Sequence, residues 1–184
     1  GLNIVTRGSV TLTNIQANEN IGEGISIFKY TGVGNMLLTN VAADGNQYGI
    51  DITADSTVPR FNNVTLNNVS ASNNDGFGIA VGANGNITWT GGAVLDNSRA
   101  ITQNDVLLQN YNHVSPAAPF GVRVSNVSLI NPLGYGLYAA SYGPVILSGV
   151  ISRNHQDYNV YLDTCGGSSY TKCDNTYLAP VTVI

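Results

Sequence analysis

The residues best suited to chemistry lie in one short polar run, residues 153–158, which reads Arg-Asn-His-Gln-Asp-Tyr. An arginine can neutralise a substrate carboxylate, and histidine or tyrosine can exchange a proton with a substrate. Arg153 is therefore the candidate cation, and His155 or Tyr158 is the candidate proton-exchange group. His113, the other histidine of the chain, is a further candidate. The alternative interpretation is an ordinary turn between strands, because His155 falls in a row of turn residues described below.

The composition of the chain excludes several classes of partner. With 7 basic and 11 acidic side chains among 184 residues, the net charge is −4. No basic stripe is present to neutralise phosphates, so we expect no nucleic-acid partner. No apolar run is long enough to span a bilayer, so we expect no membrane insertion. Motifs for a nucleotide or a metal are also missing from the sequence, and we expect neither a cofactor nor a metal.

The elements that must position the polar run repeat along the chain. Six segments each contain alternating apolar residues followed by Asn or Gly, and their third positions are Leu12, Leu38, Leu66, Trp89, Val124 and Leu147. These positions are separated by 26, 28, 23, 35 and 23 residues. A second strand-like signature follows each segment, for example residues 24–27 and 49–52, with residues 100–103 in the same slot of the fourth repeat. Period-two alternation between Asn, Gly and Asp turns predicts two short strands per repeat.

The turn residues of the repeats fall into register. In one row, every residue is of a type that tolerates a left-handed backbone conformation. This left-handed row consists of Asn14, Asn40, Asn68, Gly91, Asn126 and Gly149. A second row consists of Asn20, Asn46, Asn74 and Asn97, and His155 falls in it. Stacked Asn side chains can hydrogen-bond from one repeat to the next. The rows therefore predict an asparagine ladder.

These segments resemble the generic parallel β-helix repeat over roughly residues 9–163. The resemblance implies an all-β, right-handed parallel β-helix, a solenoid of about six coils forming one domain over residues 1–184. Residues 104–119 are then an inserted loop, and residues 164–184 form a disulfide loop and a terminal strand. The repeat is shared by polysaccharide lyases, epimerases, phage tailspikes and bacterial surface proteins, so it predicts fold and not function.

Outward positions of one predicted sheet suggest a second candidate site. They read Ser26, Asp51, Ala80, Thr102, Tyr138 and Tyr161. Neighbouring tyrosines can contact sugar rings, so Tyr138, Tyr161 and Asp51 are candidate ligand-binding residues. The alternative is a solvated face with ordinary cross-strand pairing. The inward slot of Trp89 predicts a core residue.

Two further features concern the compartment and the partners. Cys165 and Cys173 are spaced for a disulfide that closes a glycine-rich loop, which indicates an oxidising compartment; the alternative is two free thiols.

Four Asn-x-Ser/Thr sequons begin at Asn63, Asn68, Asn86 and Asn126, and they matter only in a eukaryotic secretory pathway. We expect the strand-like ends to stack on like subunits or on another surface protein, or the chain to continue past them.

Three functions remain open from the sequence. The first is a non-enzymatic structural, fibre-forming or adhesive module of an extracellular or cell-surface microbial protein. The second is a lyase or epimerase that acts on an acidic polysaccharide through Arg153 and His155. The third is a carbohydrate-binding module that uses Tyr138 and Tyr161. The paired-aspartate and Gly-His-Gly patterns of other enzymes with this fold are missing, which favours the first function.

Overall fold

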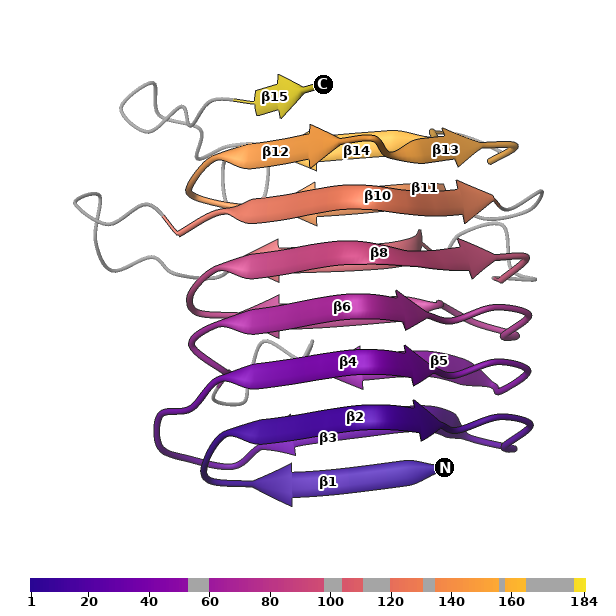
Figure 1. Ribbon diagram of the computed structural model, residues 1–184, viewed down its shortest axis with the longest axis vertical. Coiled ribbons are helices and arrows are strands. Elements are labelled where there is room, and N and C mark those ends of the chain that lie inside the picture. Colours follow the sequence, from indigo (N-terminus) through magenta and orange to yellow (C-terminus); the bar gives the residue numbers. More distant parts are fainter. Residues whose placement is uncertain (53–59, 98–103, 111–119, 131–134, 156–157, 165–180) are drawn as a thin grey trace.

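A computed structural model of the chain shows a right-handed parallel β-helix (Figure 1). It describes residues 1–52, 60–97, 104–110, 120–130, 135–155, 158–164 and 181–184. Every strand pairing within this part of the chain is parallel, as predicted. The described residues include no helix that is long and apolar enough to cross a membrane.

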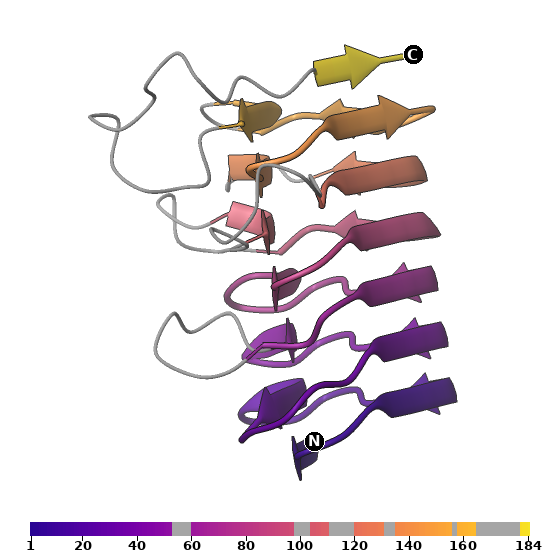
Figure 2. The same cartoon turned by 90° about the vertical axis from the view of Figure 1, so that its left-hand side faces the viewer.

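Two parallel sheets form the walls of the solenoid, and Figure 2 shows them side by side. Sheet A contains seven strands: β1 (Leu2–Thr6), β3 (Glu23–Lys29), β5 (Tyr48–Ile52), β7 (Ile79–Ala83), β9 (Asn104–Asn110), β11 (Tyr135–Ala140) and β14 (Val160–Asp163). Sheet B contains eight: β2 (Val10–Gln16), β4 (Met36–Ala42), β6 (Val64–Ser70), β8 (Ile87–Leu95), β10 (Val122–Ile130), β12 (Val145–Ser148), β13 (Ile151–Arg153) and β15 (Val181–Val183). The six predicted repeats are β2, β4, β6, β8, β10 and β12, and five complete turns separate the first from the last.

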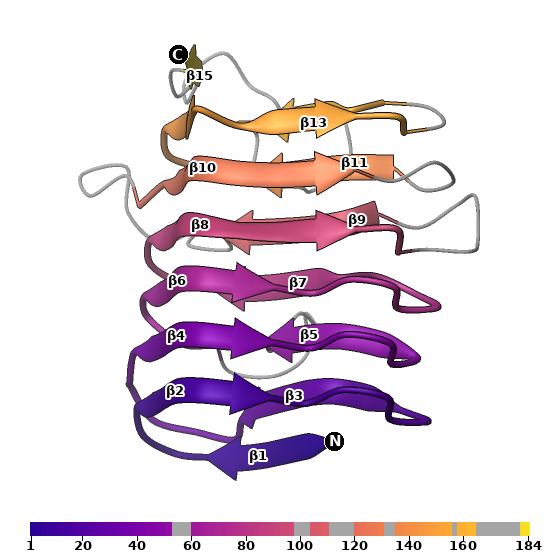
Figure 3. The same cartoon turned by 45° about the vertical axis from the view of Figure 1, so that its right-hand side comes forward.

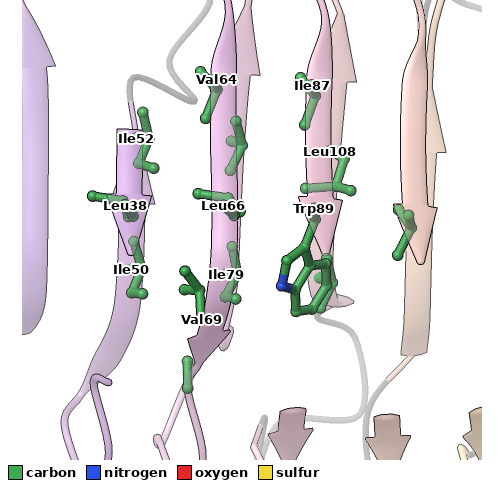
Figure 4. Packing of buried hydrophobic residues seen from close by; sticks show 14 of the residues in the cluster. Leu38, Ile50, Ile52, Val64, Leu66, Val69, Ile79, Ile87, Trp89 and Leu108 are labelled. Atoms are coloured by element: carbon green, nitrogen blue, oxygen red, sulfur yellow. The ribbon is translucent and has the colours of Figure 1, made fainter. Parts of the chain in front are cut away.

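The core lies between the two sheets and follows the predicted apolar rows. Leu38, Leu66, Trp89 and Val124 are in register on neighbouring strands of sheet B, and all four are fully buried. Isoleucines of β5 and β7 face them from sheet A (Figure 4). The prediction that Trp89 is a core residue is confirmed. Each coil therefore buries its apolar side chains against the coils before and after it.

The left-handed row and the asparagine ladder are both confirmed. All six residues of the first row have positive φ, between 51° and 70°, and Asn40 and Asn68 each donate a side-chain hydrogen bond to the preceding Asn at 3.0 Å. In the second row, the side-chain oxygens of Asn46, Asn74 and Asn97 accept bonds from both the backbone and the side chain of the preceding row member, at 2.8–3.2 Å. This second row, which we call the buried ladder, lies in the turns that stack along the rod (Figure 3).

The fourth coil differs from the prediction. The sequence predicts a loop over residues 104–119 and a strand over residues 100–103. The structure instead places β9 at Asn104–Asn110, with Val106 in register with Ile79 and Leu137. Val106 and Leu108 are the fully buried apolar residues of this strand. The predicted loop is therefore wrong for residues 104–110, and Leu107 lies in the outward row of sheet A.

Several predicted features lie outside the described residues. They are the strand over residues 100–103 with Thr102, residues 111–119 of the predicted loop, His113, Cys165 and Cys173. The predicted terminal strand is present as β15, which pairs with β12.

Candidate functional site

The main cluster of candidate ligand-binding side chains is a group of four tyrosines on the outer side of sheet A. Tyr135 and Tyr138 come from β11, Tyr158 precedes β14, and Tyr161 lies within it. Tyr138 and Tyr161 are in register on neighbouring strands, as the sequence predicts. All four side chains are half-buried. We call this group the tyrosine patch.

The rings of the patch pack on one another. The ring centroids of Tyr135 and Tyr158 are 4.8 Å apart with an interplanar angle of 12°. Those of Tyr138 and Tyr161 are 5.2 Å apart at 7°, and Tyr158 and Tyr161 are joined by a tilted contact at 5.4 Å. Stacked aromatic pairs of this kind contribute about 0.5–1.5 kcal/mol beyond their burial. The patch is therefore ordered before any ligand arrives.

Polar groups at the rim of the patch fix two of the hydroxyls. The Tyr158 hydroxyl donates to Asn104 Oδ1 at 2.7 Å, and the Tyr138 hydroxyl donates to Asp163 Oδ2 at 3.4 Å. Asp163 follows Tyr161 by two residues, so strand alternation places both on the outer side of the sheet. Asp163 is not among the residues predicted from the sequence, although this alternation could have identified it.

Asp51 does not belong to the patch. It occupies the same outward row, but Ala80 and Leu107 lie between it and Tyr138 in register. Asp51 is therefore three strands away from Tyr138. Asp163 supplies the carboxylate of the patch.

The stacking also changes what the patch can offer to a sugar. Neighbouring strands are about 4.8 Å apart, which is too close for two rings to lie flat on the sheet side by side. The rings therefore stand and stack, and they present mainly edges and hydroxyl groups. Such a surface favours hydrogen bonds with sugar hydroxyls over the ring-on-ring stacking expected from the sequence.

His155 is buried inside the corner of the solenoid. Its side chain is fully shielded from solvent, as is that of Asp105, and its Nδ1 lies 3.5 Å from Asp105 Oδ2. Burial lowers the pKa of His155, and the backbone of Leu129 acts in the opposite direction. Asp105 occupies the register position that holds Gly78 immediately before β7 and Gly136 in β11. The pair thus combines two exceptions: an acid in a glycine row and a histidine in an asparagine row.

The three residues proposed for proton chemistry are not presented together. Arg153 is exposed at the end of β13, whereas the imidazole of His155 is buried. The Tyr158 hydroxyl is engaged by Asn104. Neither proton-exchange group is offered at the surface beside Arg153.

A buried lysine lies near the other end of the rod. The side chain of Lys29 is fully buried, its Nζ has no hydrogen-bond partner among the described residues, and it lies 5.0 Å from the centroid of the Phe61 ring. Burial lowers the pKa of Lys29. The aromatic face compensates part of the desolvation. The full burial of the amine leaves it unable to meet a ligand in this state.

The described residues hold no group of three or more His, Cys, Asp or Glu side chains that could bind a metal ion. Comparison with models of protein families, with curated proteins and with solved structures finds no match for this chain.

Proposed function

We propose that this chain is a non-enzymatic, extracellular adhesive module that binds carbohydrate through the tyrosine patch. The observation that supports this proposal is the set of four tyrosines that pack together on the outer side of sheet A beside the Asp163 carboxylate. The solenoid is the scaffold, and the patch is the contact surface.

The order of the patch favours binding. Tyrosine provides a large amphipathic contact area with few rotatable bonds, so little side-chain entropy is lost when a ligand is bound. Stacking and the bond from Tyr158 to Asn104 reduce that loss further. Phenol hydroxyls and the Asp163 carboxylate can then exchange hydrogen bonds with sugar hydroxyls.

An adhesive role also agrees with the scaffold. Ladders of side-chain hydrogen bonds run along the rod, and they stabilise each coil on its neighbours. The low number of charged side chains suits a surface that meets neutral glycans. The burial of His155 argues against a lyase or epimerase that needs this imidazole at the surface.

The first experiment measures binding of the chain to a panel of immobilised neutral and acidic polysaccharides, followed by calorimetry with the oligosaccharide of the best hit. We expect Tyr161→Leu to weaken binding at least about tenfold, equivalent to about 1.4 kcal/mol. The leucine keeps apolar cover over the strand while it removes the hydroxyl and the stack.

Tyr48→Leu is the matched control. Tyr48 also stacks on a ring of the next coil, Phe77, at 5.0 Å, but it lies in β5, away from the patch. We expect this variant and His155→Asn to bind as the parent does. Absence of carbohydrate binding, or an equal loss in Tyr48→Leu, would overturn the proposal.

A further inference from the structure

The outer face of sheet B is a second surface with a distinct chemistry. Three outward rows run along its six main strands, and none of their eighteen side chains or glycines is buried. The first row is Thr11, Leu37, Thr65, Thr88, Arg123 and Ile146; the second is Thr13, Thr39, Asn67, Thr90, Ser125 and Ser148; the third is the left-handed row. Arg123 is the one ionisable side chain among them.

The hydroxyls of this face are directed to solvent. Eight of the twelve side chains in the first two rows are Thr or Ser. Among the described residues of this face, the one hydroxyl-to-hydroxyl contact joins Thr90 and Ser125, at 3.2 Å. The other hydroxyls remain available as donors and acceptors. In the third row, Asn14, Asn40 and Asn68 bond to one another along the rod, beside these hydroxyls.

The face is regular in the direction of the rod axis. Its strands are paired in register from β2 to β12, so equivalent side chains repeat at about the strand spacing of 4.8 Å. Figure 1 looks onto these strands, which lie one above another with little rotation between them. A ligand that makes the same contact at each coil must itself repeat at a similar distance, which is comparable to the length of one pyranose ring.

We propose that the outer face of sheet B binds an extended, neutral polysaccharide whose chain runs along the rod axis, with successive sugar rings over successive coils. The near absence of charge excludes strong attraction of an acidic polymer, because uronates would find Arg123 alone. The alternating hydroxyl and amide rows match the hydroxyls of a neutral glycan. This surface is separate from the tyrosine patch, and the proposal does not depend on carbohydrate binding there.

The test uses the full chain with β-1,4-glucan oligosaccharides of two to six rings and with insoluble cellulose. We expect affinity to rise with each added ring up to about six, because each ring meets a further coil. We also expect the affinity to be the same at low and high salt, since no charge pair contributes. Affinity that stops rising at two rings would overturn the axial arrangement.

Variants locate the site. Thr13→Val, Thr39→Val and Thr65→Val together remove three outward hydroxyls while keeping the shape and the strand preference of each residue. We expect at least tenfold weaker binding to the longest oligosaccharide. Thr31→Val, which removes an exposed hydroxyl outside the strands, is the matched control and should change nothing.

Thr39→Lys keeps the test informative if the triple variant folds poorly. A lysine at this outward position of β4 should preserve the fold, and its side chain should block access of the glycan to the outer face of sheet B. We therefore again expect weaker binding. Three outcomes would each overturn the proposal. They are unchanged glucan binding in Thr39→Lys, a preference of the parent protein for polygalacturonate over glucan, and adsorption to ice crystals without glucan binding. A loss of binding in Tyr161→Leu alone would concern the tyrosine patch and would not bear on the outer face of sheet B.

Discussion

Asp105 and His155 each differ from the other residues of their rows, and their side chains lie next to each other. In the buried ladder an Asn side chain bonds to a backbone carbonyl of the preceding coil, as Asn97 does to Ala71 at 2.8 Å. His155 takes this place in the last coil, facing the Leu129 backbone, and it is larger than Asn. Gly136 leaves it space, since a β-carbon there would lie 3.0 Å from the His155 ring. The His155 ring then lies next to the buried carboxylate of Asp105, so each of these two unusual polar residues gives the other a polar neighbour inside the solenoid.

The stability of the protein should depend on the protonation of His155. Because burial lowers the pKa of His155 in the folded chain, the unfolded chain binds the proton more readily. The full contribution to stability is present above the ordinary histidine pKa of about 6.5. It decreases as the pH falls through the folded pKa. Urea unfolding at a series of pH values from 8 to 5 checks this expectation.

His155→Asn is the comparison variant, since Asn is the residue of this row in earlier coils. We expect its free energy of unfolding to depend less steeply on pH over the same interval. A parent protein that becomes more stable on acidification would show the opposite sign. It would mean that attraction between the imidazolium and Asp105 outweighs the effect of burial.

At the scale of elements, the two asparagine rows look alike in sequence but have different environments. Asn74 is 1% exposed, and its amide donates to Ala43 and Asn97 while its oxygen accepts from Asn46. Asn68 is exposed, and its amide bonds to Asn40. The buried ladder satisfies buried turn groups, whereas the left-handed row mainly supplies residues that accept positive φ.

Replacement of these asparagines should separate the two roles. We expect Asn74→Gly to lower the free energy of unfolding by about 2–4 kcal/mol, because several buried polar groups lose their partners at once. Asn68→Gly keeps the left-handed backbone and removes one exposed bond, so it should change stability by less than about 1 kcal/mol. Denaturant unfolding of both variants measures the difference. Equal losses would show that the buried bonds carry no special weight.

The repeats of sheet B were predictable because each carries its signal locally. Leu12, Leu38 and Leu66 stand at the same position of similar segments, and the left-handed row required only Asn or Gly. The fifth strand of sheet A, β9, was not predictable in the same way. Its small residue is replaced by Asp105, which is compensated by His155 fifty residues later. The local pattern therefore indicates a strand over residues 100–103 instead of β9.

The tyrosine patch was predictable in part for a related reason. Tyr138 and Tyr161 belong to one outward row, and alternation places them together. Tyr135 begins β11 and Tyr158 precedes β14, and both join the patch through ring contacts. Whether two rings stack or lie flat depends on the distance between strands and on side-chain rotamers, which a sequence row does not contain. Asp51 lies in the same outward row, three strands away from Tyr138, so its role in ligand binding stays a prediction.

At the scale of the whole molecule, stability passes from one coil to the next. Partners in register are 23 to 35 residues apart, so each coil contacts its two neighbours and little else. In such an arrangement, stability approximates a sum of coil terms and interface terms. A defect in a central coil should then weaken the connection between the two ends of the rod as well as the coil itself.

Trp89 is the residue on which this coupling can be tested. It is fully buried in β8, in register with Leu66 on one side and Val124 on the other. Trp89→Ala leaves a cavity at both interfaces and should lower the free energy of unfolding by about 3–5 kcal/mol. We expect hydrogen exchange under mild denaturant to show that amides of β10 and β12 lose protection at a different denaturant concentration from those of β2 and β4. Trp89→Phe fills most of the space and removes an indole N–H for which the described part of the chain offers no hydrogen-bond partner. In this variant the two groups of amides should lose protection together. If all strands of Trp89→Ala lose protection at one concentration, the rod unfolds as a single cooperative unit, and the coupling between coils extends beyond nearest neighbours.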